Sequence, residues 1–471
     1  MRQRHVRFAF QAAVLALASY ACNAIVDPTS SPAEGDGGLD GSEADGSSPP
    51  DAGAHTDADA SENAPDADAA DAFPDALDAN VPLTCLRSFG DSSEQVTYGV
   101  AMDTQGKLFI AGYHAGALDF GSGALPSSDS GGFGGVHVAK FDETCALLWA
   151  RGWAGGSPGR PSTVTMAVTA AGDVWLAGAQ KYTLVNGSDG EVVNQILYGG
   201  SINTYAMTLD PLGNICTTGE LLGVEGDFGG GPLPSSGANL FVAKLDANGG
   251  HIWSKSFGVD ATPSTIAAAP NGDVLVTGYY QEDIDFGGGS LGSGGRRSFL
   301  ARLAAADGSH VWSQGWSMHF PIVATSPGGD VYLGGRIDNK GVTFGPGVTI
   351  APDAGQSFVA KFAGDGGAVW AFGLDDKILG GIAATATDVR TFGNALASYR
   401  ASDGQVVWRQ PLQPLGGSIL ESTQGLAVGP AGETVAAAGY TGTISTPGHT
   451  ITSKSQPGMP PLRDIMLLRR P

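Results

Sequence analysis

A short turn followed by a β-rich strand recurs through the chain. In a clear copy, Gly272-Asp-Val-Leu-Val-Thr-Gly278, a two-residue turn signal precedes alternating β-forming residues, a pattern that predicts a hairpin strand. Seven copies begin at positions 106, 172, 213, 272, 329, 387 and 432, so the spacings are 66, 41, 59, 57, 58 and 45 residues. Periods of this length are typical of repeat architectures in which each unit is one supersecondary element. The repeat therefore predicts an all-β protein, and the 73 glycines supply its turns.

Each repeat contains three further strand signals. A strand of small residues, such as Ile266-Ala-Ala-Ala269, precedes the turn, and an Asp-Phe-Gly linker leads to a third strand such as Phe299-Leu-Ala-Arg302. The fourth strand carries a tryptophan, which we expect to be a structural blade residue: Trp149, Trp253, Trp312, Trp370 and Trp408. Small residues suit the crowded innermost strand of a propeller blade. Four strands in each of seven units predict a seven-bladed β-propeller.

The two ends of the repeat region are complementary. The chain ends on a third-strand equivalent, Asp464-Ile-Met-Leu-Leu468, with no fourth strand after it. The region begins with Thr84-Cys-Leu-Arg-Ser-Phe-Gly90, which matches the fourth-strand segment Trp253-Ser-Lys-Ser-Phe-Gly258. We therefore expect residues 84–471 to form one ring, closed by the N-terminal strand, which would leave the last blade no open edge.

The first 83 residues differ in composition from the ring. Residues 1–21 combine three arginines, a short apolar stretch and small residues, as a secretory signal peptide does, so we expect export. The segment before Cys22 resembles a bacterial lipobox, which implies lipidation of Cys22; ordinary cleavage after Ala21 or Ala24 is the alternative. Residues 23–83 hold 15 of the 47 acidic residues and no Lys or Arg. We expect residues 22–83 to be a lipidation site followed by a disordered acidic linker.

At the repeat strands the sequence resembles the SBBP-type bacterial β-propeller repeat, with its Gly-Asn turn, aromatic-Val-Ala-Lys strand and Trp-x-x-x-Phe-Gly segment. Two repeats depart from the pattern, because blades 2 and 6 lack the Val-Ala-Lys strand and Asn194 replaces the tryptophan of blade 2. The run Leu245-Asp-Ala-Asn-Gly-Gly-His-Ile-Trp253 is also similar to the docking motif of PQQ-type propeller repeats. The SBBP resemblance implies an exported scaffold and no particular reaction.

The residues offer little for catalysis. Asp119, Asp227 and Asp285 begin Asp-Phe-Gly linkers that lack every other part of a kinase, so we interpret them as structural turn residues. No histidine pair has zinc spacing, and we expect no cofactor. Catalysis by residues spread over several blades would leave no local motif and stays open. Among the cysteines, Cys216 replaces an apolar strand residue and should be a core thiol, and Cys85 and Cys145 should be neighbours that allow a disulfide.

The connections between blades point to a ligand face. We expect the Gly/Ser-rich segments 121–135, 229–239, 287–297 and 345–356 to lie on the same face as the links between blades, with Arg160, Arg296, Arg297 and His319 as its polar candidates. Our first hypothesis is a non-catalytic binding or scaffold propeller of the cell envelope, at the outer membrane or cell surface, or else periplasmic or secreted. A protein or glycan partner, no nucleic acid, a membrane contact only through a lipid, and a monomer would accompany it. The alternatives are a carbohydrate lyase or hydrolase and an envelope-assembly lipoprotein of the PQQ-like type.

Overall fold

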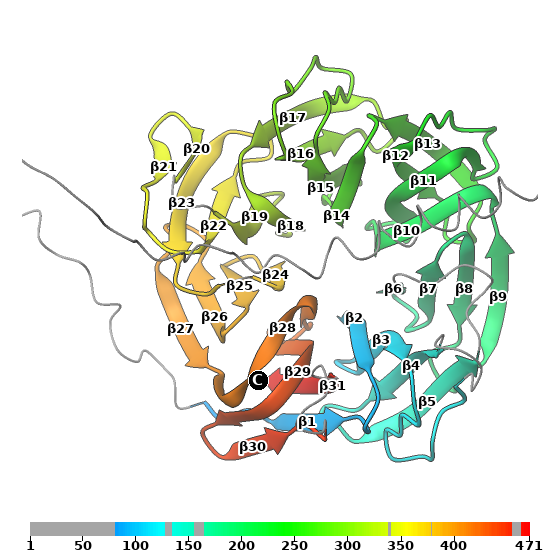
Figure 1. Cartoon of the computed structure of the whole chain (residues 1–471), viewed down its shortest axis with the longest axis vertical. Helices are drawn as coiled ribbons and strands as arrows, with labels where there is room; N and C mark the ends of the chain where they lie inside the picture. The colour runs from blue at the N-terminus through cyan, green and yellow to red at the C-terminus, as the bar shows by residue number, and fades with distance from the viewer. Residues whose placement is uncertain (1–80, 128–133, 155–163, 338–340, 378, 455–462) are drawn as a thin grey trace, which may run out of the picture. The chain divides into compact units, whose positions relative to one another are not determined.

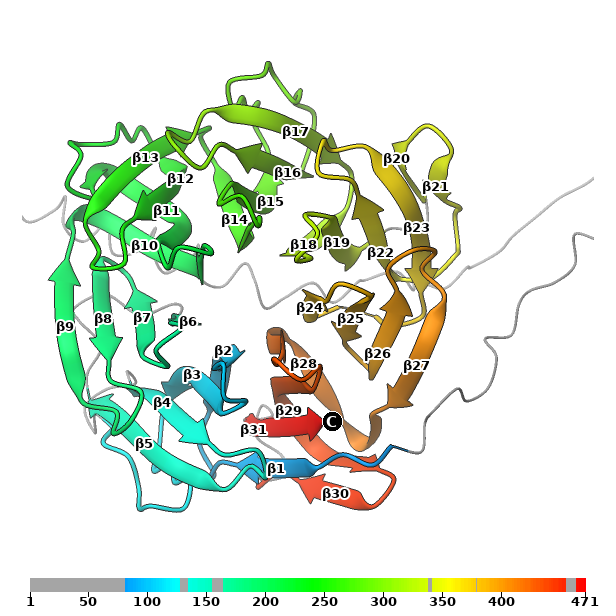
Figure 2. The same cartoon turned by 180° about the vertical axis from the view of Figure 1, so that it is seen from behind.

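The computed structural model describes residues 81–127, 134–154, 164–337, 341–377, 379–454 and 463–471. Strands supply all of the regular secondary structure in these residues, and seven antiparallel sheets surround a common centre (Figures 1 and 2). The predicted seven-bladed propeller is therefore confirmed. The predicted signal peptide, Cys22 and nearly all of the predicted linker lie outside the described residues. Within the described ranges, no helix is long and apolar enough to cross a membrane.

The blades are numbered along the chain, and their strands are given from the innermost to the outermost. Blades 1 and 2 contain β2 (Gln95–Met102), β3 (Leu108–His114), β4 (Gly135–Phe141) and β5 (Leu147–Ala154), then β6 (Thr165–Val168), β7 (Val174–Gly178), β8 (Lys181–Val185) and β9 (Val192–Leu197). Blades 3 and 4 contain β10 (Gly199–Leu209), β11 (Ile215–Asp227), β12 (Ala238–Leu245) and β13 (His251–Phe257), then β14 (Ala261–Ala268), β15 (Val274–Tyr280), β16 (Arg297–Leu303) and β17 (His310–Trp316). Blades 5 and 6 contain β18 (His319–Thr325), β19 (Val331–Arg336), β22 (Ser357–Phe362) and β23 (Ala368–Leu374), then β24 (Gly381–Ala384), β25 (Asp388–Phe392), β26 (Ala395–Arg400) and β27 (Val406–Pro411). Blade 7 contains β28 (Gln413–Val428), β29 (Thr434–Thr446), β31 (Asp464–Arg470) and β1 (Cys85–Phe89).

The N-terminal strand closes the ring, as the sequence predicts. Strand β1 pairs antiparallel with β31 in the register that joins Cys85 to Arg469 and Phe89 to Ile465. Each innermost strand contacts the innermost strand of the next blade, and β28 of blade 7 contacts β2 of blade 1. Blade 7 thus combines the two ends of the propeller, and its third and fourth strands are the only ones in the ring, as described, that no turn connects.

Blades 2 and 6 keep their third strands, β8 and β26, although the Val-Ala-Lys motif is missing from both. Their shortening lies instead in the connection between the second and third strands, which is two residues long, Ala179–Gln180 and Gly393–Asn394. The predicted four strands are therefore present in both blades, because a strand needs only β-forming residues that fit the sheet.

The longer connections pack against the outer parts of the blades. Asp119, Asp227 and Asp285 each accept hydrogen bonds from the backbone N–H groups two and four residues later, which holds the loop in a turn. The phenylalanine that follows each of them is buried, and Phe286 packs against Phe257 of the preceding blade with ring centroids 4.9 Å apart. Such an aromatic pair contributes about 0.5–1.5 kcal/mol beyond its burial. Two more connections carry the hairpin of β20 (Val342–Gly345) with β21 (Val348–Ile350) and the strand β30 (His449–Thr452), which lie at the rim in Figure 1.

Four seams between blades share one tryptophan contact. The indole N–H of Trp312 in blade 4 donates to the carbonyl of Gly364 in blade 5 over 3.0 Å. The matching bonds join Trp149 to Gly187, Trp253 to Ala305 and Trp370 to Ala401 at 3.1, 3.1 and 3.2 Å. A glycine with positive φ in the same turn lies against three of the rings with no room for a Cβ, as Gly366 (φ 89°) does against Trp312. The repeated tryptophans therefore lock each blade onto the next.

Three seams replace this contact. Asn194 stands in the tryptophan position of blade 2, and Tyr198 donates instead to the carbonyl of Gly249 over 2.7 Å. Trp408 of blade 6 lies under the guanidinium of Arg470, 3.7 Å from the ring centroid, at the seam to blade 7, whose third and fourth strands have no turn between them. At the closing seam Cys85 occupies the tryptophan position and forms a disulfide with Cys145 of blade 1.

Candidate functional site

The strand order gives the ring two different faces. We call the face with the turns between first and second strands and between third and fourth strands the turn face. The loop face holds the connections between second and third strands and the links from each blade to the next. Because every blade is antiparallel, all seven repeats place the same parts of the repeat on the same face.

On the turn face one ion pair recurs in five of the seven blades. A third-strand cation of blades 1, 3, 4, 5 and 7 meets an acid from the first turn of its own blade: Lys140–Asp103, Lys244–Asp210, Arg302–Asp273, Lys361–Asp330 and Arg469–Glu433, at 2.8 to 3.3 Å. The first four cations also donate to a carbonyl of the next blade. Burial alone would raise the pKa of Asp210, but hydrogen bonds from Lys244 and Asn214 hold it below its usual value.

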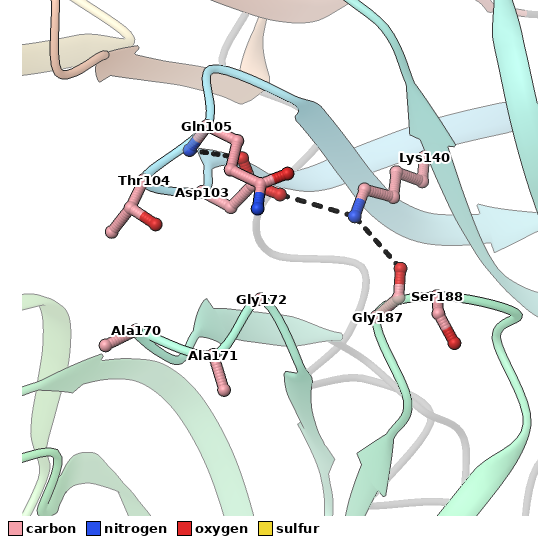
Figure 3. Close-up of a pocket in the computed structure, with 9 residues that line it drawn as sticks. All are labelled: Asp103, Thr104, Gln105, Lys140, Ala170, Ala171, Gly172, Gly187 and Ser188. Atoms are coloured by element: carbon pink, nitrogen blue, oxygen red, sulfur yellow. Dashed lines mark hydrogen bonds and ion pairs between the residues drawn. The ribbon is translucent and has the colours of Figure 1, made fainter.

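A pocket on this face illustrates the pairing. Between blades 1 and 2, Asp103, Thr104 and Gln105 oppose Gly172, Gly187 and Ser188. The ammonium of Lys140 lies 3.3 Å from Asp103 and donates over 2.9 Å to the carbonyl of Gly187 (Figure 3). The pocket therefore contains a seam contact that recurs around the ring, and we interpret its residues as structural.

The loop face is built differently, because the inner strands are interrupted there. A β-bulge shifts the register at Tyr98 of blade 1, Tyr205 of blade 3 and Ser264 of blade 4, and an irregularity in blade 5 spans Phe320 and Pro321. A bulge adds one unpaired residue and turns side chains out of the regular alternation. The residue after the second-strand glycine lies at the same end of the sheet and differs between blades: Tyr113, Ala179, Glu220, Tyr279 and Arg336.

We call this set of residues, together with Arg296 and His319, the mouth. One part of it joins blades 3 and 4, where Glu220 is 8% exposed. Glu220 accepts hydrogen bonds from the hydroxyls of Tyr205 and Thr262, over 3.0 and 2.6 Å. Burial raises the pKa of Tyr205 above its usual value, and the neighbouring Glu220 and Tyr279 add to the effect. The tyrosine therefore stays neutral and can act as a hydrogen-bond donor.

The predicted polar residues of the ligand face fall in different places. Arg296 is exposed and its guanidinium lies 4.0 Å from the ring centroid of Tyr279, at the mouth. Arg297 points into the outer half of blade 4, where it donates to the carbonyl of Gly315 over 3.4 Å. His319 begins β18, is half-buried and pairs in register with Arg336. Arg160 lies outside the described residues. The Gly/Ser-rich connections begin at the loop face, but Gly230 and Gly288 lie against the outer-strand residues His251 and His310.

The sequence analysis missed the tyrosines of the mouth and Glu220. A signal for them was present, because the residue after the second-strand glycine varies while the flanking repeat residues stay regular. The bulges themselves leave no mark in a pattern of alternating residues.

A pair of histidines is buried in blade 1. The rings of His114 and His137 are 5.6 Å apart, and His137 stands where blades 3, 4 and 5 have Phe241, Phe299 and Phe358. Burial lowers the pKa of both imidazoles, and that of His137 lies well below its usual value. No group of three metal-ligating residues occurs among the described residues. Cys216 is buried and has no disulfide, and burial raises the pKa of its thiol to about 12.

Comparisons with known proteins give the chain no family. No protein-family model matches it, and no curated protein matches it in sequence. Among solved structures, that of U3-55K aligns with a TM-score of 0.48 and 10% identity over 81% of this chain and 98% of that chain. The WD40 repeats of RRP9 align with a TM-score of 0.48 and 9% identity over 82% of this chain and 97% of that chain. We take no functional inference from these distant likenesses.

Proposed function

We propose that the protein is a non-catalytic binding module of the cell envelope, exported and anchored through Cys22, whose ligand binds at the mouth. One observation carries the proposal. On the turn face the same ion pair between a third-strand cation and a first-turn acid recurs in five blades, whereas the mouth carries tyrosine, phenylalanine, arginine and carboxylate side chains that differ between blades. Repetition serves the ring itself, and a varied set of aromatic and polar residues at one end of it suits recognition of a ligand.

Two features support export. The N-terminal 21 residues have the composition of a signal peptide, and the Cys85–Cys145 bond belongs to proteins that reach an oxidising compartment. The resemblance to SBBP-type repeats fits the same proposal. Mass spectrometry of the mature protein tests the anchor: we expect an acylated Cys22 at the N-terminus, and an unmodified N-terminus after Ala21 or Ala24 would overturn it.

Binding is tested with the full chain on an array of glycans and purified envelope polysaccharides. We expect the variant Tyr98→Ala/Tyr205→Ala to lose at least about tenfold in affinity, because each aromatic anchor at a binding surface contributes 1 kcal/mol or more, roughly. The matched control is Leu212→Ala, which removes a residue that is 83% exposed on the turn face. Thermal melting of each variant separates lost binding from lost folding.

Two results would refute the proposal. Binding that Tyr98→Ala/Tyr205→Ala leaves unchanged while Leu212→Ala abolishes it would place the ligand on the turn face. Breakdown of any polysaccharide by the unmodified chain would replace the non-catalytic module with the enzyme alternative.

A further inference from the structure

Two arginines of the mouth have no partner of opposite charge. Arg296 of blade 4 and Arg336 of blade 5 are both exposed, and within the described part of the chain neither forms an ion pair or a hydrogen bond. Arg296 makes only its stack on Tyr279. From Thr84 onward the chain carries 32 acidic and 22 basic residues, so carboxylates outnumber cations in this region of the chain. Two unpaired guanidinium groups on neighbouring blades of such a ring therefore need an explanation outside the ring.

An exposed and strained phenylalanine lies beside them. Phe320 is 46% exposed and has φ of 49°, in the left-handed region. A bulky side chain is rare there, and the following Pro321 further disfavours any conformation outside the extended region. Strained backbone of this kind is found preferentially at ligand sites. Burial of the ring stabilises the fold little, because the ring is largely exposed. The strained backbone of Phe320 is therefore not explained by packing, and we attribute it to ligand binding.

The two features belong to one surface. Strand β18, which carries His319 and Phe320, contacts β14, β15 and β16 of blade 4. Arg336 pairs with His319 in register, and Tyr279 and Arg296 lie at the same end of blade 4. The seam between blades 4 and 5 thus presents two aromatic rings and two guanidinium groups at the loop face.

The chemistry of these groups selects a ligand class. A guanidinium binds a carboxylate through two parallel hydrogen bonds, and an aromatic ring offers a flat apolar face. A sugar ring that carries a carboxylate presents both complements, because its C–H face is apolar and its carboxylate is anionic. An acidic peptide that binds by strand addition would need a regular unpaired edge, but the free edges of β14 and β18 are broken by register shifts at this end. We propose that this seam binds a carboxylated saccharide chain, an inference that rests on the proposed function and names its ligand.

The test compares one polymer in two charge states. Polygalacturonate and its fully methyl-esterified form share a backbone, and only the first carries carboxylates. We expect the full chain to bind polygalacturonate at least about tenfold more tightly, and Arg296→Ala/Arg336→Ala to lose that preference, because one charge-assisted hydrogen bond is worth about tenfold or more. Arg87→Ala is the matched control, since Arg87 is exposed on β1 at the rim. Equal binding of the two polymers, or a preference that survives in the double variant, would overturn the proposal.

Phe320 gives an independent readout. Phe320→Gly should reduce the affinity for polygalacturonate about tenfold while the melting temperature stays equal or rises, because glycine adopts a positive φ without strain. A purely structural Phe320 would instead leave affinity unchanged or lower the melting temperature. Poly-glutamate is the second arm: if it binds as tightly as polygalacturonate, the saccharide assignment is wrong. Binding of a neutral glycan that Tyr98→Ala/Tyr205→Ala removes would leave the proposed function standing without this ligand.

Discussion

Blade 4 and blade 7 are joined to the blade that follows them by different chemistry. Blade 4 meets blade 5 through Trp312, whose ring leaves no room for a side chain at Gly366. At the seam that leads into blade 1, the equivalent positions are Cys85 and Cys145, which are covalently bonded. Cys145 even keeps the positive φ of the glycine it replaces, 59°. The packed pair Trp312 and Gly366 and the disulfide-bonded pair Cys85 and Cys145 therefore occupy equivalent positions at their seams.

The difference coincides with the way the strands of blade 7 are connected. In the other six blades a tight turn connects the third strand to the fourth, but β31 and β1 are joined by hydrogen bonds alone. The Cys85–Cys145 disulfide joins β1 to blade 1. This covalent bond compensates for the missing turn between β31 and β1. The comparison teaches that a repeat is most altered where its chain connectivity is broken.

Removing the closing strand should have the largest effect. Deletion of residues 84–90 leaves β31 with an open edge and removes the fourth strand of blade 7. We expect loss of a single cooperative transition in urea, because a ring with one incomplete blade no longer unfolds as a unit. Deletion of residues 74–80 is the length-matched control. A truncated ring that melts like the full chain would show that closure contributes nothing.

Converting the closing seam into the blade 4 type should have an intermediate effect. Cys85→Ala/Cys145→Ala removes a bond between residues 60 apart in sequence, which in the chain-entropy account destabilises the fold by about 4 kcal/mol. We expect the unmodified protein in reductant to match this variant, and Cys85→Trp/Cys145→Gly to recover part of the loss without responding to reductant. Urea denaturation with and without dithiothreitol measures all three. Identical midpoints for the unmodified protein in both conditions would contradict the prediction.

The smallest expected effect concerns the histidine pair. His137→Phe gives blade 1 the residue type that blade 4 has at the equivalent position, Phe299. Both ring nitrogens of His137 are buried without a hydrogen-bond partner in the described structure. The variant should therefore be more stable at pH 7 by about 1–2 kcal/mol. Because the folded pKa of His137 is lowered, the unfolded chain binds the proton first, and stability falls as the pH drops below about 6.5.

The measurement is the difference in unfolding free energy between the unmodified protein and the variant, from pH 7 to pH 4. This difference should grow on acidification, and the carboxylates titrate alike in both proteins, including Asp464, whose pKa burial raises. His310→Asn, at a partly exposed histidine hydrogen-bonded to Ser313, is the control. A difference that stays constant with pH would show that His137 is not a buried neutral imidazole.

The sequence predicted the blades because their signals are local. A glycine turn and an alternating strand recur wherever a blade forms, and the match between Thr84–Gly90 and Trp253–Gly258 indicated the closure. The seam contacts were not predictable in detail. Whether Trp312 reaches Gly364 depends on the register between strands of different blades, and that register is set by packing over the whole ring.

The candidate site was predicted only in part. Arg296 and His319 lie at the mouth, but Arg297, the first residue of β16, donates to the carbonyl of Gly315 in the outermost strand of its own blade. Tyr98 and Tyr205 could not be assigned, since a bulge shifts them by one residue relative to a regular strand. The sequence analysis did not single out His137, although it stands at the repeat position that is Phe299 in blade 4.

The disulfide also decides how the ring would bear load. A pull applied to the chain ahead of Leu83 reaches β1 at Cys85, the first residue of that strand. The bond to Cys145 passes the force directly into blade 1, before the hydrogen bonds between β1 and β31 are stretched one after another. A force applied at the N-terminal side of the propeller would therefore not separate β1 from β31, the two strands of blade 7 that no turn connects.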